Sequence, residues 1–163
     1  MKKIIIFSLL AILSLPVHAR WFLGGNVAMW YDTRSALFSL SVLPEVGYEF
    51  NDKCAVGGQV GFAIAAEEDY SGGAGVIAPF FRYTFWHNDI LAVDMRATLG
   101  FSFSDVLVAS EVSVSPYIRF TPHEHFDIYL KLGAAGFFYS EDDCRFGFGA
   151  DSNDFAVGCA YRF

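Results

Sequence analysis

The feature that most constrains this chain is a two-residue alternation of side chains that runs through most of it. Between Leu37 and Phe50, every even position is apolar, while the odd positions carry serine, glycine, glutamate and a single leucine, Leu43. The same alternation recurs over residues 91–103 and 126–138. Successive side chains of a β-strand point to opposite faces, whereas an α-helix repeats every 3.6 residues. The pattern therefore predicts strands with one apolar and one polar face.

Extending this reading along the chain predicts eight strands joined alternately by short and longer connections. The expected strands are Trp21–Tyr31, Leu37–Phe50, Cys54–Ala65, Val76–Phe85, Ile90–Phe103, Glu111–Phe120, Phe126–Tyr139 and Phe155–Phe163. Residues 51–53, 86–89 and 121–125 form the short connections, and 32–36, 66–75, 104–110 and 140–154 the mostly longer ones. Transmembrane barrels have short periplasmic turns and longer outer loops. We predict an all-β, eight-stranded antiparallel up-and-down transmembrane β-barrel with both termini on the periplasmic side.

The first nineteen residues have the organisation of a secretory signal peptide. Lys2 and Lys3 precede an apolar core, Ile4–Leu15, and small residues occupy the −3 and −1 positions of a cleavage site after Ala19. This core is too short to span a bilayer. We therefore expect residues 1–19 to be removed, leaving 20–163 as one barrel domain.

The composition supports a β-structure with one face in lipid. The chain is 54% hydrophobic and 18% aromatic, yet its longest uncharged stretch after the leader, Cys54–Ala66, has 13 residues. A membrane-spanning helix needs about 20 apolar residues, and closed barrels are the other structure that satisfies its backbone in hydrocarbon. The net charge of −7 argues against nucleic-acid binding, which needs a basic surface.

The predicted inward face carries ten charges that sum to zero. The five acids are Glu45, Glu49, Asp94, Glu111 and Asp127, and the five bases are Arg82, Arg96, Arg119, Lys131 and Arg162. Buried charges are costly unless they are paired, and an eight-stranded barrel is just wide enough for its side chains to fill it. We expect a lumen plugged by ion pairs. A narrow pore stays open as an alternative, because Gly57, Gly61, Ala63 and Gly133 are also expected to face inward.

Outward aromatic residues are predicted in two bands near the ends of the strands. The band at the turns comprises Trp21, Tyr48, Phe50, Tyr83, Phe85, Phe120, Phe126, Tyr161 and Phe163. The band at the loops comprises Tyr31, Phe38, Phe101, Phe103 and Phe138. Aromatic girdles mark both interfaces of membrane barrels.

The last strand ends in a recognisable pattern, with Gly158, Tyr161 and the terminal Phe163 in a Gly-x-x-aromatic-x-aromatic spacing. This resembles the assembly signal of bacterial outer-membrane barrels. With the segments 44–53 and 79–83, it makes the chain similar to the small outer-membrane β-barrel family, often labelled porin family or OmpX- and OmpA-like. The resemblance implies insertion into the outer membrane by the barrel assembly machinery after escort by periplasmic chaperones. Outer-membrane lipids and lipopolysaccharide are then its surroundings.

No residue pattern predicts catalysis, a cofactor or a metal site. Cys54, Cys144 and Cys159 match no redox or zinc spacing, and the three histidines of the mature chain, His87, His123 and His125, fall in short turns. A lipid-modifying enzyme acting at the outer leaflet would need a base near the loops, where no histidine occurs. We therefore expect a barrel that is not an enzyme.

The acidic residues outside the lumen concentrate in the long connections: Glu67, Glu68, Asp69, Asp105, Glu141, Asp142, Asp143, Asp151 and Asp154. A solvated surface explains them, and bridging through divalent cations to lipopolysaccharide is an alternative. The leading hypothesis is a closed barrel that anchors acidic surface loops. A secreted lipocalin-like barrel is the alternative outside the membrane, and it would place the apolar faces inside.

Overall fold

A computed structural model describes residues 20–32, 37–67, 70–104, 108–140, 143–149 and 155–163. The expected signal peptide, with Ala19 at its end, lies outside the described residues, as do most of the acidic loop positions. No helix in the described part of the chain has the length and apolar character needed to cross a membrane.

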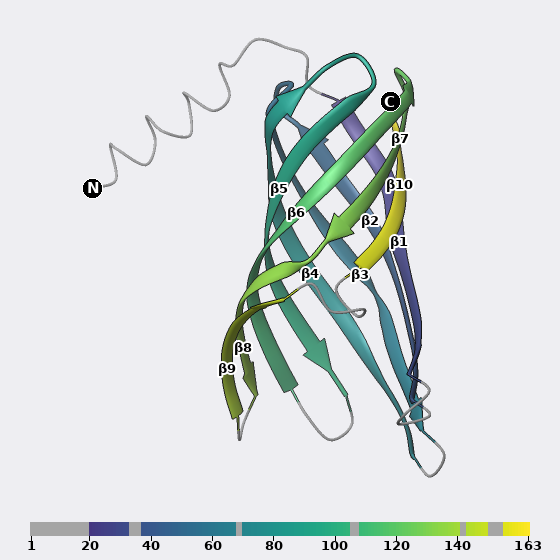
Figure 1. Cartoon of the computed structure of the whole chain (residues 1–163), viewed down its shortest axis with the longest axis vertical. Helices are drawn as coiled ribbons and strands as arrows, with labels where there is room; N and C mark the ends of the chain where they lie inside the picture. The colour runs from purple at the N-terminus through teal and green to yellow at the C-terminus, as the bar shows by residue number, and fades with distance from the viewer. Residues whose placement is uncertain (1–19, 33–36, 68–69, 105–107, 141–142, 150–154) are drawn as a thin grey trace, which may run out of the picture.

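The strands close into an antiparallel barrel (Figure 1). They are β1 (Arg20–Asp32), β2 (Leu37–Glu49), β3 (Cys54–Glu67), β4 (Tyr70–His87), β5 (Leu91–Phe103), β6 (Val108–His123), β7 (Phe126–Leu132), β8 (Ala134–Ser140), β9 (Asp143–Gly149) and β10 (Phe155–Arg162). β7 pairs with the second part of β6 and β8 pairs with its first part, so the two strands together occupy one position in the barrel. Pairing of β5 with β6 and of β1 with β10 completes a ring of eight, which confirms the predicted fold.

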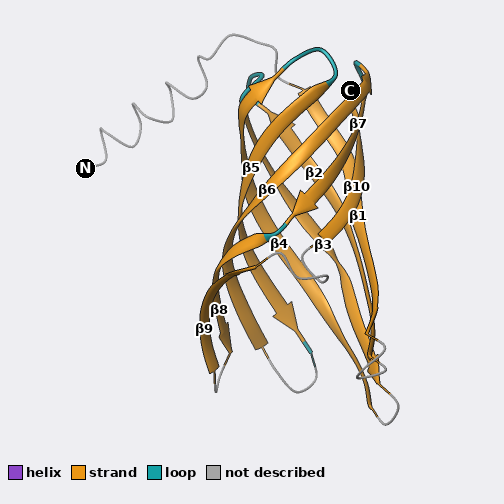
Figure 2. Cartoon of the chain, viewed as in Figure 1, coloured by secondary structure: helices purple, strands orange, loops and turns teal. Residues whose placement is uncertain are grey.

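The three tight turns gather at one end of the barrel, together with Arg20 and the C-terminus (Figure 2). Two of these turns are built by asparagine side chains. The Asn51 Oδ1 accepts hydrogen bonds from the backbone N–H groups of Lys53 and Cys54, and the Asn88 Oδ1 accepts from Ile90 and Leu91. Asparagine favours tight turns because its side chain can satisfy backbone donors two or three residues ahead. We call this end the turn side and the opposite end the loop side.

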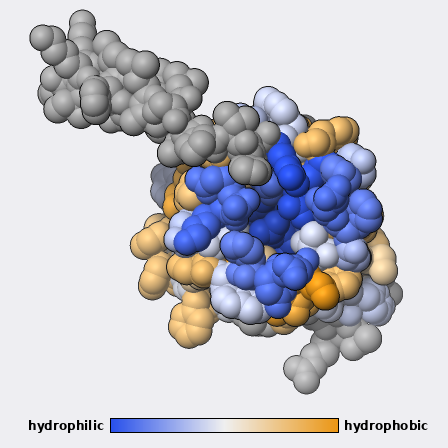
Figure 3. Space-filling model, turned by 90° about the horizontal axis from the view of Figure 1, so that it is seen from above, coloured by the Kyte–Doolittle hydropathy of each residue, from blue (hydrophilic) through white to orange (hydrophobic). Residues whose placement is uncertain are grey.

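Polar side chains face the lumen and apolar side chains face outward. In β5, buried Ala92, Asp94 and Arg96 alternate with more exposed Leu91, Val93 and Met95. Seen from the turn side, hydrophilic residues fill the centre and hydrophobic residues surround it (Figure 3). A lipocalin-like barrel would have the opposite faces, so the structure contradicts that alternative.

A β-bulge at Gly133 separates β7 from β8 and corrects the predicted register. Tyr117 of β6 pairs with Lys131, but Val114 pairs with Ala135, so one extra residue lies on the β7–β8 side. Gly133 adopts a φ of 153°, which L side chains rarely adopt. The extra residue exchanges the two faces. An unbroken alternation over residues 126–138 would place the odd positions, including Ala135, in the lumen. Beyond Gly133 the even positions face the lumen instead, so the prediction was wrong there: Ala135 faces outward and Phe138 faces inward.

Several connections are shorter than the sequence predicted. Residues 66–75 were expected to form a loop, but β3 and β4 continue through most of it, and Glu67 pairs with Tyr70. β6 begins at Val108, within another expected connection. The connection expected at 140–154 contains β9, which forms a hairpin with β8. Alternating small residues such as Gly72 to Gly75 fit the pleated sheet, although their composition is typical of loops.

Candidate functional site

The turn-side half of the lumen contains two sets of ion pairs. In the set nearest the turns, Arg119 binds Asp94 at 2.8 Å and approaches Asp127 at 3.6 Å, and Arg162 binds Asp127 at 2.6 Å. The hydroxyls of Thr84 and Thr121 donate to Asp94 and Asp127, each at 2.7 Å. These groups come from strands β4, β5, β6, β7 and β10, so the network spans the barrel interior.

The second set joins the two glutamates of β2 to arginines of β4 and β5. Arg96 binds the Glu45 carboxylate at 2.9 Å, and the Gln59 amide donates to the same oxygen at 2.8 Å. Arg82 pairs with Glu49. All four charged side chains are buried, and Arg96 and Glu45 are each only 2% exposed. The charge-assisted bonds offset the large cost of removing these ions from water.

Aromatic rings fill the space around the buried guanidinium groups. The Arg96 guanidinium lies 4.1 Å from the ring centre of Phe80 and 4.6 Å from that of Tyr117. Arg82 lies 5.1 Å from the ring centre of Phe22. Stacking on an aromatic face stabilises a cation through the ring quadrupole. The lumen at this level is therefore occupied by side chains.

Three aromatic rings of the lumen, Phe22, Phe80 and Tyr129, lie over glycines of the neighbouring strand. Phe22 is paired with Gly47, Phe80 with Gly57 and Tyr129 with Gly158. A Cβ atom added at any of the three glycines would overlap the ring of its partner. Glycine is thus required at Gly158 for packing inside the barrel, whatever its part in an assembly signal.

The structure brings together eight of the ten predicted lumen charges, four carboxylates and four guanidinium groups whose charges cancel. The other two lie elsewhere: Glu111 faces the lumen but is exposed, and Lys131 is half-buried. Sequence reasoning missed the neutral members of the cluster: Phe22, Gln59, Phe80, Thr84, Tyr117, Thr121 and Tyr129. The alternation places these residues on the inward face. It does not show which of them contacts a charged group, because that depends on the tilt of the strands.

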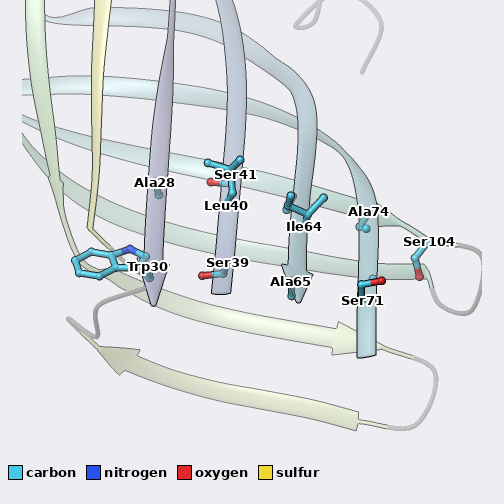
Figure 4. Close-up of a pocket in the computed structure, with 13 residues that line it drawn as sticks. Ala28, Trp30, Ser39, Leu40, Ser41, Ile64, Ala65, Ser71, Ala74 and Ser104 are labelled. Carbon is cyan, nitrogen blue, oxygen red and sulfur yellow. The ribbon is translucent and has the colours of Figure 1, made fainter. Parts of the chain in front are cut away.

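The loop-side half of the lumen is hollow. A cavity of about 610 Å³ is lined by four serines, four alanines, two glycines and Trp30, Leu40 and Ile64 (Figure 4). None of these residues is charged. A smaller cavity of about 290 Å³ opens at the turn side, where Arg20, Glu49, Asp89, Arg119 and Arg162 are among its lining residues. The two cavities lie on opposite sides of the ion-pair network.

The outward aromatic residues at the turn side contact one another in pairs. Trp21 and Tyr48 have ring centres 5.1 Å apart, Tyr83 and Phe85 4.9 Å, and Tyr161 and Phe163 5.2 Å. At the loop side, Tyr31, Phe101 and Phe103 are exposed on the outer surface. Phe138 does not belong to this band, because the bulge at Gly133 turns it inward.

The cysteines and histidines form no recognisable chemical centre. Cys54, Cys144 and Cys159 are free thiols, and Cys144 lies in β9 rather than in a loop. The rings of His123 and His125 are 5.7 Å apart, and His125 stacks on Tyr161. Within the described residues, no three His, Cys, Asp or Glu side chains are placed to hold a metal ion.

Comparison of the sequence with models of known protein families and with curated proteins found no match. The resemblance to the small outer-membrane barrel family therefore stays a prediction based on the residues quoted for it.

Proposed function

We propose that this protein is an integral outer-membrane β-barrel, without enzymatic activity, that does not conduct solutes and that anchors its loop side at the cell surface. The ion-pair network carries the proposal. Eight charged side chains from six strands, β2, β4, β5, β6, β7 and β10, cross the turn-side half of the lumen and are held by one another and by aromatic rings. In a wide aqueous channel these side chains would lie flat against the barrel wall and leave the centre of the lumen open.

The outer surface supports a membrane location. Large apolar side chains on all sides are exposed, among them Leu23 at 56%, Val60 at 61% and Leu99 at 49%. A soluble monomer rarely exposes a contiguous apolar patch of more than a few hundred Å². A hydrocarbon environment removes this difficulty, and the aromatic pairs at the turn side fit a membrane interface.

The periplasmic chaperones, the barrel assembly machinery and lipopolysaccharide are the partners that this location entails. The turn side, with both ends of the barrel, would face the periplasm. Glu67 ends β3 and Asp143 begins β9, so both lie at the loop side, the side that would face the lipopolysaccharide head groups. The remaining acidic loop residues lie outside the described part of the chain.

Single-channel recording tests the closed lumen. The mature chain, refolded into a planar bilayer and shown to be folded by a heat-dependent gel shift, should give no stable openings. Steady ion-selective openings would contradict the proposal and favour the narrow pore, with Arg82, Asp94 and Arg96 as the charges beside the ion path.

A further inference from the structure

The loop-side cavity has the size and lining of a small-molecule site. Its volume of about 610 Å³ falls within the usual range of ligand pockets. Toward the turns, the next inward residues of β2 after Ser41 are Leu43 and the network residue Glu45, so the ion-pair network borders the cavity at that end. The lining is neutral, and the exposed carboxylate of Glu111 faces the same half of the lumen. A neutral ligand fits this environment, whereas Glu111 would repel an anionic one.

The barrel wall beside this cavity has a seam. β1 pairs with β10 only from Phe22 to Val27, although β1 continues to Asp32. β9 pairs with β8 alone. Positions 28–32 of β1 pair with β2 on one side. Among the described residues, no strand pairs with their other edge or with the edge of β9 that faces away from β8. β8 and β9 diverge from β1 below the end of β10 (Figure 1). Residues 150–154, which join β9 to β10, lie outside the described residues.

Trp30 lies at this seam. Its ring extends from β1 on the side away from Ser39 and Ile64 (Figure 4), and its centre is 6.4 Å from that of Phe155 at the start of β10. The indole nitrogen is buried, and no hydrogen-bond acceptor for it is present in the described part of the chain. A buried donor without an acceptor is costly, so a ligand that supplies one would be stabilised there.

The outer border of the seam is strongly apolar. On β9, Phe146 is 74% exposed and Phe148 is 90% exposed, and both alternate with the lumen-facing positions of that strand. On β1, Met29 is 65% exposed beside the unpaired edge. An alkyl chain beside the barrel would thus meet apolar side chains on both borders of the seam.

We propose that the loop-side cavity binds one linear alkyl chain with a neutral, oxygen-bearing head, and that the chain enters sideways between β1 and β9. The alkyl part lies along the alanine and glycine wall, and the head oxygen accepts the hydrogen bond of the Trp30 indole. The sideways route rests on the proposed membrane location, because it requires hydrocarbon outside the seam.

Tryptophan fluorescence tests the site directly. The chain has three tryptophans, so the double substitution Trp21→Phe and Trp86→Phe leaves Trp30 as the reporter. The full mature chain is refolded in phosphatidylcholine vesicles and titrated with a long-chain primary alcohol that carries a terminal bromine, a contact quencher. We expect saturable quenching of Trp30.

A matched pair of substitutions identifies the cavity. Ala65 and Ala66 are adjacent in β3, but Ala65 lines the cavity and Ala66 faces the opposite side of the sheet. In the reporter background, Ala65→Phe should abolish the saturable quenching and Ala66→Phe should preserve it. Quenching that rises linearly with equal slope in all three chains shows partitioning into the bilayer only and would overturn the site.

A second arm separates the two routes of entry. Phosphatidylcholine brominated on its acyl chains cannot leave the bilayer, so it can reach Trp30 only from the side. If this lipid quenches Trp30 and the Ala65→Phe substitution abolishes that quenching, entry through the seam is supported. Quenching by the free alcohol alone overturns the seam and places the entrance at the loop mouth. A folded, inserted barrel without a saturable site leaves the proposed function intact, whereas failure to insert would contradict that function.

Discussion

The two halves of this barrel are both built from antiparallel strands but differ in what fills them. The turn-side half contains arginines, carboxylates and aromatic rings, and eight of its charged groups are paired. The loop-side half presents serine, alanine and glycine to a cavity of about 610 Å³. Strand number alone makes an eight-stranded interior narrow. The comparison shows that the inward side chains decide whether such an interior is closed or hollow.

The contact between β1 and the strand that closes the barrel also differs between the two halves. At the turn side, β10 pairs with β1, and the terminal Phe163 N–H donates to the Trp21 carbonyl at 2.9 Å. At the loop side, β10 has ended and β8 turns back into β9. The closed and the hollow halves thus differ in their wall as well as in their contents.

The largest expected effect comes from removing one charge of the network. Arg96→Met leaves the buried Glu45 carboxylate without its cation, which costs about 3–5 kcal/mol. Glu111→Gln is the matched change in the hollow half and should alter the stability by less than about 0.5 kcal/mol, because Glu111 is exposed. Urea unfolding of the refolded protein in vesicles measures both. Equal losses would remove the distinction between the halves.

An arginine placed on the two faces of β2 sharpens the contrast between lumen and lipid. Val42 faces outward and Ser41 lines the cavity. Val42→Arg should destabilise the inserted barrel by about 2–4 kcal/mol, as for an arginine at the bilayer midplane. Ser41→Arg, one residue away, should cost much less because the cavity admits water. Folded yield in vesicles and urea midpoints report the difference, and the reverse order would mean that the faces are exchanged.

Glycine substitutions test packing at the two levels. The added methyl of Gly158→Ala overlaps the Tyr129 ring, and overpacking of this kind costs about 1–3 kcal/mol. A Cβ on Gly147, in β9, meets nothing within 4 Å, so Gly147→Ala should be nearly neutral. Thermal unfolding of the two variants in detergent gives the comparison. A stable Gly158→Ala protein would show that the aromatic layer can yield.

The smallest expected change in stability comes from the turn side, where the end of the chain is bonded to β1. Deletion of Phe163 removes one backbone hydrogen bond to Trp21 and a ring contact with Tyr161, which together should lower stability by about 1 kcal/mol. In cells the folded yield should fall further, if Phe163 belongs to the assembly signal. A normal yield of heat-modifiable barrel in cells would remove the terminal residue from that signal.

The sequence predicted the barrel and the closed half well because both depend on a local pattern. Alternation places Glu45, Arg96 and Asp127 on the inner face without knowledge of their partners. The hollow half was harder to predict for two physical reasons. The Gly133 bulge shifts the register by one residue, and no local pattern distinguishes it from the neighbouring glycines. Strand β9 continues a segment whose composition is typical of a loop, and its pairing with β8 is a tertiary property.

Cysteine labelling from water tests the contrast between the halves most directly. In a chain with Cys54, Cys144 and Cys159 replaced by alanine, Ser41→Cys places a thiol in the cavity and Ser115→Cys places one beside Arg96, where Ser115 is 2% exposed. Both changes replace a hydroxyl with a thiol on the inner face. A charged, membrane-impermeant maleimide should modify the Ser41→Cys protein rapidly and leave the folded Ser115→Cys protein unmodified until urea unfolds it. Equal labelling of the two folded proteins would contradict a lumen that is closed at the turn side and hollow at the loop side.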